Sequence, residues 1–329
     1  MEVGIDLGTS NTLVYLKNKG IIFEEPSVIA FDKRTKNIIA IGKEAKKMMG
    51  RAPMNIEVTK PINFGIITDL EATSAFLTKI LDYLKKQYIS IFRPIAIIGI
   101  PLNLTEVQIR GVIDAAKTSG FKEVYIVEEP IAAALGGNLD IEEAKGIALV
   151  DIGGGTTEIS IISLGGIVIG RSIKIAGDRF NQNLMNHVRF KYNLIVGESQ
   201  VEEAKVTISS ITGKDKVFNL KGRDAITILP KEVVISSQDL REALLPSINE
   251  IIDEIKDVLN LTPPDLIGDI VGKGIYLTGG GSQLEGLANF IEKELNLGVN
   301  QLEAPLHSVV LGLGRIIENF EHYKKFCLI

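Results

Sequence analysis

Two short stretches of this sequence place an aspartate between an apolar run and a glycine turn. Asp151 follows the run 146–150 and precedes Ile-Gly-Gly-Gly-Thr-Thr, while Asp6 follows Val-Gly-Ile and precedes Leu-Gly-Thr-Ser-Asn. Because glycine has no side chain, such turns expose backbone N–H groups, and a nest of these donors suits phosphate oxygens. The negative charge of an aspartate repels phosphate. An aspartate beside a phosphate site is therefore expected only where a cation lies between the two. A tight hairpin without any ligand is the simple alternative for either stretch.

A third glycine turn lies close to the end of the chain. The turn Gly279–Gly281 follows the apolar run 274–278, and we expect Ser282 to cap a helix over residues 283–295. A strand, a glycine turn and a helix N-terminus again offer backbone donors to an anion or to the edge of a sugar. Since the two aspartate turns are one device used twice, we expect a duplicated fold with a ligand clamped between its halves. A chance pairing of two similar strand ends is the alternative.

The elements that must position these turns carry further candidate side chains. Glu129 lies at the N-terminal end of a helix that Pro130 begins, where the helix dipole alone would favour an acid. Glu202 and Lys205 fall on one face of a helix from 198 to 208, and solvated charge is the simple interpretation of that pair. Periodicity and turn signals also predict a helix over 70–88, a strand over 95–100, a helix capped by Thr105, a hairpin within 214–231 and a long helix over 239–259.

Composition narrows the class of protein. The 329 residues allow two domains with separate cores, and 45% hydrophobic with 23% charged residues is typical of a globular protein. A net charge of −5 provides no broad basic field, so we expect no nucleic-acid partner. The single cysteine, Cys327, rules out a disulfide within the chain, and three scattered histidines argue against a zinc site.

One expected connecting loop is unusually apolar. Residues 88–93 include the apolar side chains of Ile91 and Phe92. Lys85 precedes this loop and Arg93 ends it. Packing of these side chains into the core is the simple interpretation. Apolar side chains beside basic ones would also suit insertion at an anionic membrane surface.

Taken in order, the motifs resemble those of the actin, sugar-kinase and heat-shock-chaperone ATPase superfamily, and over the whole chain the bacterial actin MreB family within it. The stretches that carry this resemblance are Ile5–Thr12, Glu25–Val28, Ile126–Ala134, Val150–Glu158, Ile175–Asp178, Thr262–Leu266 and Leu277–Gly281. The resemblance implies an α/β, duplicated actin-like (ribonuclease-H-like) fold, with two domains of mixed five-stranded-type sheets flanked by helices around a nucleotide cleft.

The family also implies a domain organisation. Residues 1–140 would form the first domain, with a small inserted subdomain at about 32–65. Residues 141–329 would form the second domain, with an inserted subdomain at about 180–245 and an adenosine loop at 278–283. The C-terminal helix is expected to pack back on the first domain.

By the same resemblance, the site would bind ATP or ADP with Mg²⁺. The implied phosphate-binding residues are Gly8, Thr9, Ser10 and Asn11 in the first loop and Gly153, Gly154, Gly155 and Thr156 in the second. The implied adenosine-binding residues are Gly177, Asp178, Glu202, Lys205, Gly279, Gly280, Gly281 and Gln283. Asp6 and Asp151 would hold Mg²⁺ through its water ligands.

The resemblance assigns catalysis to Glu129, which would orient or deprotonate the attacking water with the help of Thr156. Glu128 is the alternative acid, because the choice depends on the alignment of the Glu-Pro pair. In this family the charged pair that often stands between Pro61 and Gly65 is here Asn-Phe, so contacts at that loop are expected to differ.

The resemblance implies the function of an ATP-hydrolysing, membrane-associated filament that organises cell shape. Partners would be further copies of the chain in paired protofilaments, the anionic inner face of the cell membrane and membrane proteins of the cell-shape machinery. The resemblance implies membrane binding through an N-terminal amphipathic helix or through a hydrophobic loop at the position of Ile91 and Phe92. Because the first expected strand begins at residue 3 and leaves no room for that helix, we expect Ile91 and Phe92 to be the membrane contact.

Rival functions remain at this stage. A monomeric nucleotide switch of the chaperone type would need a peptide-binding domain after residue 329. A small-molecule kinase would need a second acid to deprotonate a substrate hydroxyl. A filament that serves motility in a cell without a wall is a further alternative.

Overall fold

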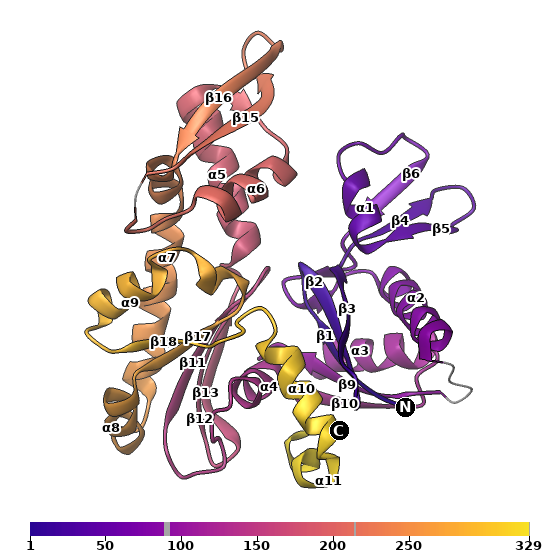
Figure 1. Ribbon diagram of the computed structural model, residues 1–329, viewed down its shortest axis with the longest axis vertical. Helices are drawn as coiled ribbons and strands as arrows, with labels where there is room; N and C mark the ends of the chain where they lie inside the picture. Colours follow the sequence, from indigo (N-terminus) through magenta and orange to yellow (C-terminus); the bar gives the residue numbers. More distant parts are fainter. Residues whose placement is uncertain (89–92, 214, 329) are drawn as a thin grey trace. The chain divides into compact units, whose positions relative to one another are not determined.

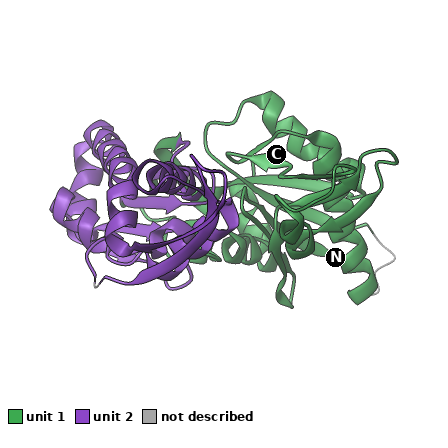
Figure 2. Ribbon diagram, turned by 90° about the horizontal axis from the view of Figure 1, so that it is seen from above, with its two compact units in different colours: residues 1–145, 162–172, 306–329 green, residues 146–161, 173–305 purple. Residues whose placement is uncertain are grey.

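The computed structural model describes residues 1–88, 93–213 and 215–328, and the chain divides into two compact units (Figure 2). Unit 1 comprises Met1–Lys145, Ile162–Ser172 and Leu306–Ile329, and unit 2 comprises Gly146–Ile161 and Ile173–Pro305. One five-stranded sheet has the strand order β10-β9-β1-β2-β3 and the other has the order β13-β12-β11-β17-β18. The expected architecture of two five-stranded sheets flanked by helices is therefore confirmed.

Unit 1 contains the first sheet and its surrounding elements (Figure 1), together with the segment Ile162–Ser172, which belongs to the second sheet described below. The strands of unit 1 are β1 (Glu2–Leu7), β2 (Asn11–Leu16), β3 (Gly20–Pro26), β4 (Ile29–Asp32), β5 (Ile38–Ile41), β6 (Ile56–Thr59), β7 (Ile62–Asn63), β8 (Ile66–Ile67), β9 (Ile95–Ile100) and β10 (Glu123–Glu128). The helices are α1 (Gly42–Met48), α2 (Leu70–Tyr88), α3 (Glu106–Ser119), α4 (Glu129–Gly136), α10 (Ser308–Glu318) and α11 (Phe320–Tyr323), followed by the short 3₁₀ turn Lys324–Phe326.

The two faces of this sheet are covered by different helices. Alternate residues of β1, such as Val3 and Ile5, join the apolar core formed with α2 and α3. On the opposite face α10 approaches so closely that a Cβ on Gly4 would lie 2.8 Å from the Cβ of Leu313. Because Asp6 has the same strand parity as Gly4, it belongs to the α10 face.

Unit 2 contains most of the second sheet and a smaller one of order β14-β15-β16. The strands of these two sheets are β11 (Ile147–Ile152), β12 (Thr157–Ser163), β13 (Gly166–Ile173), β14 (Leu194–Ile195), β15 (Val217–Asp224), β16 (Pro230–Ser236), β17 (Ile275–Thr278) and β18 (Val299–Gln301). The end of β12 and all of β13 except Ile173 fall in unit 1. The helices are α5 (Gly177–Tyr192), α6 (Glu198–Ile208), α7 (Ser237–Leu261), α8 (Pro264–Lys273) and α9 (Leu287–Leu295), with a 3₁₀ turn η1 (Gly280–Gln283).

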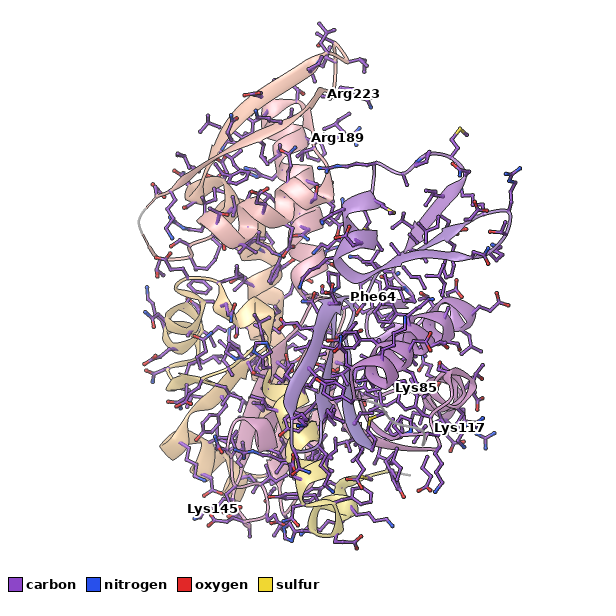
Figure 3. All side chains as sticks on the ribbon, turned by 45° about the vertical axis from the view of Figure 1, so that its right-hand side comes forward. Phe64, Lys85, Lys117, Lys145, Arg189 and Arg223 are labelled. Carbon is purple, nitrogen blue, oxygen red and sulfur yellow. The ribbon has the colours of Figure 1, made fainter. Side chains whose placement is uncertain are left out.

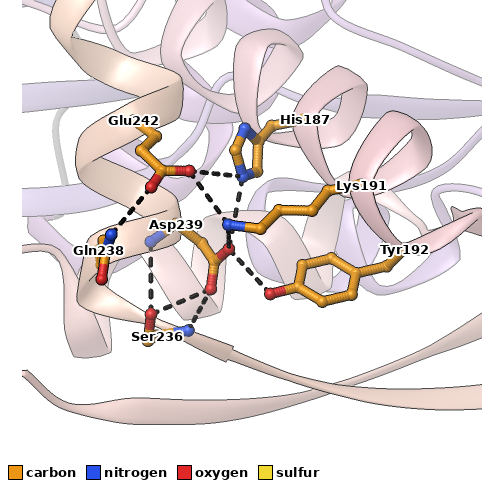
Figure 4. A network of polar contacts seen from close by, with 7 residues as sticks. All are labelled: His187, Lys191, Tyr192, Ser236, Gln238, Asp239 and Glu242. Atoms are coloured by element: carbon orange, nitrogen blue, oxygen red, sulfur yellow. Dashed lines mark hydrogen bonds and ion pairs between the residues drawn. The ribbon is translucent and has the colours of Figure 1, made fainter.

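A polar network fastens the end of α5 to the start of α7 in unit 2. Figure 4 shows its members, which are His187, Lys191, Tyr192, Ser236, Gln238, Asp239 and Glu242. Burial would raise the pKa of Asp239, but hydrogen bonds from Lys191, the Ser236 backbone and Tyr192 outweigh burial and hold that pKa well below its usual range. The Asp239 carboxylate also completes the N-terminal capping box of α7.

Most of the elements expected from sequence are confirmed, and one is wrong. The hairpin expected within 214–231 exists as β15 and β16, but its second strand continues to Ser236. Helix α2 spans 70–88, and Thr105 caps α3 through a capping box with Gln108. The expected helix over 283–295 instead begins at Leu287, and Ser282 lies inside the turn η1. The chain must change direction at Gly286, where φ is +81° and a Cβ would lie 2.1 Å from the Thr212 Oγ1.

Within the part of the chain that the structure describes, no helix combines the length and the apolar character that crossing a membrane requires.

Candidate functional site

The first glycine turn joins β1 to β2 and is braced from one side by Ser27. The Ser27 hydroxyl donates to the Gly8 carbonyl at 2.6 Å, and its backbone N–H donates to the Ser10 carbonyl at 3.0 Å. The buried Thr12 hydroxyl in turn contacts Ser27 Oγ at 2.8 Å. Ser27 therefore turns these carbonyls away from the N–H side of the turn, which favours an anion there.

Asp6 and Glu129 lie at the same edge and on the same face of the first sheet. Asp6 is paired with Gly99 on the parallel neighbour β9, so their Cα atoms are about 5 Å apart. A Cβ on Gly99 would lie 3.4 Å from Glu129 Cγ, and a Cβ on Gly8 would lie 3.7 Å from Asp6 Oδ1. The two carboxylates and the first glycine turn thus form one group within unit 1.

The neighbouring acids Glu128 and Glu129 are not equivalent. Val124 and Ile126 of β10 belong to the core beneath α2 and α3, so strand alternation assigns Glu128 to that face. Partial burial raises the pKa of Glu128. Glu129 begins α4 and lies on the opposite face, next to Gly99.

A second loop touches the first glycine turn through one hydroxyl. The Gly65 N–H donates to Thr9 Oγ1 at 2.9 Å, which leaves the Thr9 hydroxyl hydrogen to be donated elsewhere. Phe64 and Gly65 form the two-residue turn between β7 and β8, with φ values of +50° and +67°. Such a turn is rarely built with a bulky first residue, so Phe64 holds a strained backbone at this point.

The second glycine turn, between β11 and β12, is fastened to the start of α5. The N–H groups of Gly177 and Asp178 donate to the carbonyls of Gly153 and Gly154 at 3.2 and 2.7 Å. As in the first glycine turn, hydrogen bonds hold the carbonyls of this turn, and here the donors are the first N–H groups of α5. The Thr157 hydroxyl adds a bond of 2.5 Å to the Ile175 carbonyl.

The third glycine turn packs directly against the second. Strands β11 and β17 are parallel neighbours with Asp151 opposite Thr278, so both turns leave the same edge of the sheet. Gly279 has φ +81°, and a Cβ there would lie only 2.2 Å from Asp151 Oδ1. A Cβ on Gly281 would lie 2.3 Å from Ile152 Cγ2. Glycine is therefore required at both positions by close approach.

Helix α6 brings a charged pair to the start of α5. The buried Lys205 ammonium donates to the Gly177 carbonyl at 3.1 Å and to Glu202 Oε2 at 2.7 Å. Asn181, one turn into α5, donates to the same Glu202 oxygen at 2.6 Å. Its Oδ1 is buried and has no hydrogen-bond partner within the described chain. Sequence analysis missed Asn181 and Ser27, although Ser27 stands in the Glu-Pro-Ser-Val motif.

The two aspartates offer the hard oxygen donors that a divalent cation such as Mg²⁺ takes. Asp151 is only 8% exposed, and burial raises its pKa to about 7. A cation beside this carboxylate would offset the cost of burying its charge. The residues present therefore fit the expected metal.

The structure brings the predicted residues together in two groups. Unit 1 collects Asp6, the turn Gly8–Asn11 and Glu129. Unit 2 collects Asp151, the turn 153–156, Gly177, Asp178, Glu202, Lys205 and Gly279–Gly281. Gln283 is exposed at the end of η1. The predicted membrane residues Ile91 and Phe92 lie outside the described residues.

A separate cluster has ligand types that can bind metal. One ligand atom from each of His187, Asp239 and Glu242 lies within 4.8 Å of the others. The Lys191 ammonium lies 2.8 Å from Asp239 and 3.0 Å from Glu242 and already supplies positive charge to both carboxylates. We therefore interpret this cluster as an ion-pair network.

Comparisons with known proteins agree with this architecture. The family model described as MreB/Mbl protein matches residues 1–325. The cell shape-determining protein Mbl of Bacillus subtilis (strain 168) is 38% identical over 326 residues, which cover 98% of each chain. Crystal structures of MreB5 of Spiroplasma citri bound to ADP and to AMPPNP superpose with TM-scores of 0.93 and 0.92, at 33% and 32% identity, and both cover 98% of this chain and 98% and 97% of theirs.

A more distant structure, the MamK double helical filament, has a TM-score of 0.81 at 22% identity and covers 96% of this chain and 98% of its own. That likeness concerns the fold alone. The duplicated sheets and these structural matches define an actin-like fold. Within that class, the chain belongs to the MreB/Mbl family, as its sequence motifs predicted.

Proposed function

We propose that this protein binds and hydrolyses ATP and assembles into filaments that organise cell shape. One arrangement, found in both units, carries the proposal. In each unit an aspartate at the end of a strand lies beside a glycine turn, and the carbonyls of that turn accept hydrogen bonds from a neighbouring segment. Ser27 supplies those bonds in unit 1 and the start of α5 supplies them in unit 2. Two anion-binding turns, each with its own carboxylate, suit the phosphates of a nucleotide and a bridging cation.

The glycine turns would bind the phosphates through their N–H groups, and Thr9 would donate its hydroxyl hydrogen to a phosphate oxygen. Mg²⁺ held by Asp6 and Asp151 would neutralise charge on the β- and γ-phosphates. Glu129 would accept a proton from the attacking water, with Thr156 as a second hydrogen-bonding group. Its position on the Asp6 face supports Glu129 over Glu128 for this role.

The adenosine would lie against the third glycine turn and the α5–α6 pair. Lys205, Glu202 and Asn181 form one connected group there, and Gly177 ties that group to the second phosphate turn. MreB5 of Spiroplasma citri, which shares this fold over nearly its whole length, has been solved with ADP and with AMPPNP.

Filament assembly in paired protofilaments is supported by family membership, and the cell-shape role by the name of the Mbl relative. We place the filaments in the cytoplasm at the inner face of the cell membrane, with Ile91 and Phe92 as the membrane contact. Membrane proteins of the cell-shape machinery are the proposed partners there. We also propose the domain organisation that the family implies, in which the first domain ends at residue 140 and the second begins at residue 141.

The test is phosphate release by wild type, Glu129→Gln and Glu128→Gln at equal ATP and Mg²⁺. We expect Glu129→Gln to lose about 10²- to 10⁴-fold in turnover while ATP affinity stays unchanged, because only proton transfer is removed. Glu128→Gln is the matched control. Unchanged turnover in Glu129→Gln would show that another group activates the water.

A further inference from the structure

Asn181 is a buried polar side chain with unused hydrogen-bonding capacity near the start of α5. Polar side chains further along this helix reach the surface, as Arg189 does near its other end (Figure 3). Asn181 differs from them, because it is only 3% exposed. Its Oδ1 is buried, and no residue in the described part of the chain donates a hydrogen bond to it. A buried acceptor without a donor costs free energy, so it calls for a specific explanation.

The orientation of the Asn181 amide follows from its neighbour Glu202. The Asn181 Nδ2 group donates to Glu202 Oε2 at 2.6 Å, and the Lys205 ammonium donates to the same oxygen at 2.7 Å. An ionised carboxylate accepts hydrogen bonds and cannot donate them, so the NH₂ side of the amide must face Glu202. The reverse orientation would place two acceptor oxygens against each other. Oδ1 is therefore the amide atom that is left without a donor.

Lys205 has the complementary unused capacity beside Asn181. Its ammonium is buried, with the residue 8% exposed, and it donates to the Gly177 carbonyl at 3.1 Å and to Glu202. An ammonium has three N–H groups, and the third has no acceptor among the residues that the structure describes. Because Asn181 and Lys205 share one acceptor oxygen, an unused acceptor and an unused donor lie next to each other in unit 2.

A ligand hydroxyl is the group that satisfies both side chains at once. A hydroxyl has one O–H donor and two acceptor lone pairs, so it can donate to Asn181 Oδ1 while it accepts from Lys205. A planar amino group, such as that of adenine, donates hydrogen bonds but does not accept them. A nucleotide carries hydroxyls on its ribose, at the 2′ and 3′ positions.

Gly177 determines which part of a nucleotide would meet this pair. Its carbonyl accepts from Lys205, and its N–H donates to the Gly153 carbonyl of the second glycine turn at 3.2 Å. Asn181 follows Gly177 by four residues, which is about 6 Å along the axis of α5. The ribose adjoins the phosphates in a nucleotide and separates them from the base. Groups that lie next to a phosphate-binding turn therefore meet the ribose before they meet the base.

We propose that Asn181 is a specificity-determining residue that selects ribonucleotides, because its Oδ1 accepts a hydrogen bond from a ribose hydroxyl to which Lys205 donates. The proposal rests on the proposed function, since it assigns recognition of the sugar to one residue of the adenosine site. A nucleotide without that hydroxyl leaves Oδ1 as it is in the free protein, and it forgoes one buried hydrogen bond. The free protein thus keeps an acceptor ready that only the correct sugar satisfies.

The first test changes the ligand and leaves the protein intact. Calorimetric titrations of the wild-type chain, with Mg²⁺ present, compare the affinities for ATP, 2′-deoxy-ATP and 3′-deoxy-ATP. We expect one of the two deoxy nucleotides to bind about tenfold more weakly than ATP, the effect of one lost hydrogen bond. The analogue that loses affinity identifies the hydroxyl. Equal affinities for all three nucleotides overturn the proposal.

The second test asks whether Asn181 causes that discrimination. Asn181→Leu removes the acceptor and should bind ATP and the weaker analogue about equally, whereas Asn181→Asp keeps an acceptor oxygen and should retain the ratio of the two affinities. The added charge of the aspartate weakens both nucleotides alike and cancels in that ratio. Asn183→Leu is the matched control, because the Asn183 amide donates to Ser247 of α7 at 2.8 Å. Discrimination that persists in Asn181→Leu overturns the proposal, since another group would then recognise the hydroxyl.

The third test separates the sugar from the base. Inosine triphosphate has a carbonyl in place of the adenine amino group, and we expect Asn181→Leu to leave the ratio of the ATP and inosine triphosphate affinities unchanged. If Asn181→Leu changes that ratio instead, Oδ1 accepts from the base and the proposal is overturned. If the wild type binds no ATP, the proposed function fails first; if it binds ATP but does not distinguish the deoxy nucleotides, only the role of Asn181 is refuted.

Discussion

Replacing Gly279 by alanine tests the packing of the third glycine turn on the second. Gly279 has φ +81°, and its new Cβ would lie 2.2 Å from Asp151 Oδ1 and 2.4 Å from the Ile152 carbonyl oxygen. The left-handed conformation costs alanine about 1–2 kcal/mol. Relief of the two collisions by backbone movement costs about 1–3 kcal/mol more. We therefore expect a loss of about 2–5 kcal/mol in unfolding free energy.

Gly20 provides a matched control for the strain alone. Its φ is +82°, nearly the same as that of Gly279, and a Cβ there would meet nothing within 4 Å. Gly20→Ala should therefore lose only the conformational part, about 1–2 kcal/mol. The difference between the two variants isolates the collision with Asp151 and Ile152.

Urea unfolding followed by far-ultraviolet circular dichroism measures both variants. Gly279→Ala should unfold at clearly lower urea than Gly20→Ala, and it should also bind ATP more weakly because the collision displaces Asp151. Equal unfolding midpoints for the two variants would refute the close approach of the two turns. Normal ATP affinity in a destabilised Gly279→Ala protein would separate this packing from nucleotide binding.

Three further predictions follow from other parts of the molecule. Ser27→Ala should weaken ATP binding about tenfold or less, the equivalent of about 1 kcal/mol for one lost brace of the first turn, whereas Ser27→Thr keeps the hydroxyl; equal affinities in a titration would contradict this role. Asp239 has a lowered pKa when folded, so its stabilising effect is complete above the unfolded pKa of about 4 and is lost as pH falls below it; Asp239→Asn should flatten that acid limb in thermal unfolding scans, and an unchanged limb would refute it. Ile91→Ser with Phe92→Ser should release the protein from anionic vesicles in a flotation assay, and continued flotation would move the membrane contact elsewhere.

The glycine turns and their aspartates could be predicted from sequence because the relevant signals are local. An aspartate at the end of an apolar run followed by glycines predicts a strand, a tight turn and exposed N–H groups without knowledge of distant contacts. Helix α2 and the capping box of α3 were predictable for the same reason, since periodicity and capping act within one or two turns.

The helix expected over 283–295 shows where local reasoning fails. The sequence predicts Ser282 as the N-terminal cap of that helix. In the structure its hydroxyl instead donates to the Gly279 carbonyl at 2.7 Å inside a 3₁₀ turn. The helix begins only at Leu287 because the segment 209–213 approaches Gly286, and that contact comes from residues about seventy positions away.

The bracing groups were equally invisible in the sequence. Ser27 stands in the Glu-Pro-Ser-Val motif, but that motif does not reveal its bond to Gly8, 19 positions away. Asn181 has no distinctive local pattern, and its role depends on a bond to Glu202 across 21 positions. The segment 214–231 was predicted only as a small hairpin, since exposure of Ile226 and Leu229 is a property of the folded chain.

The sequence by itself determined the set of glycine turns with their aspartates, because turns depend on short-range backbone preferences. The ordered motifs, through their resemblance to a known family, also gave the family and the fold class. Only the tertiary structure decided which turns pack together and that Glu129 shares a sheet face with Asp6. Strand register and burial fix those relations, and both are set by contacts between segments that are distant in the chain.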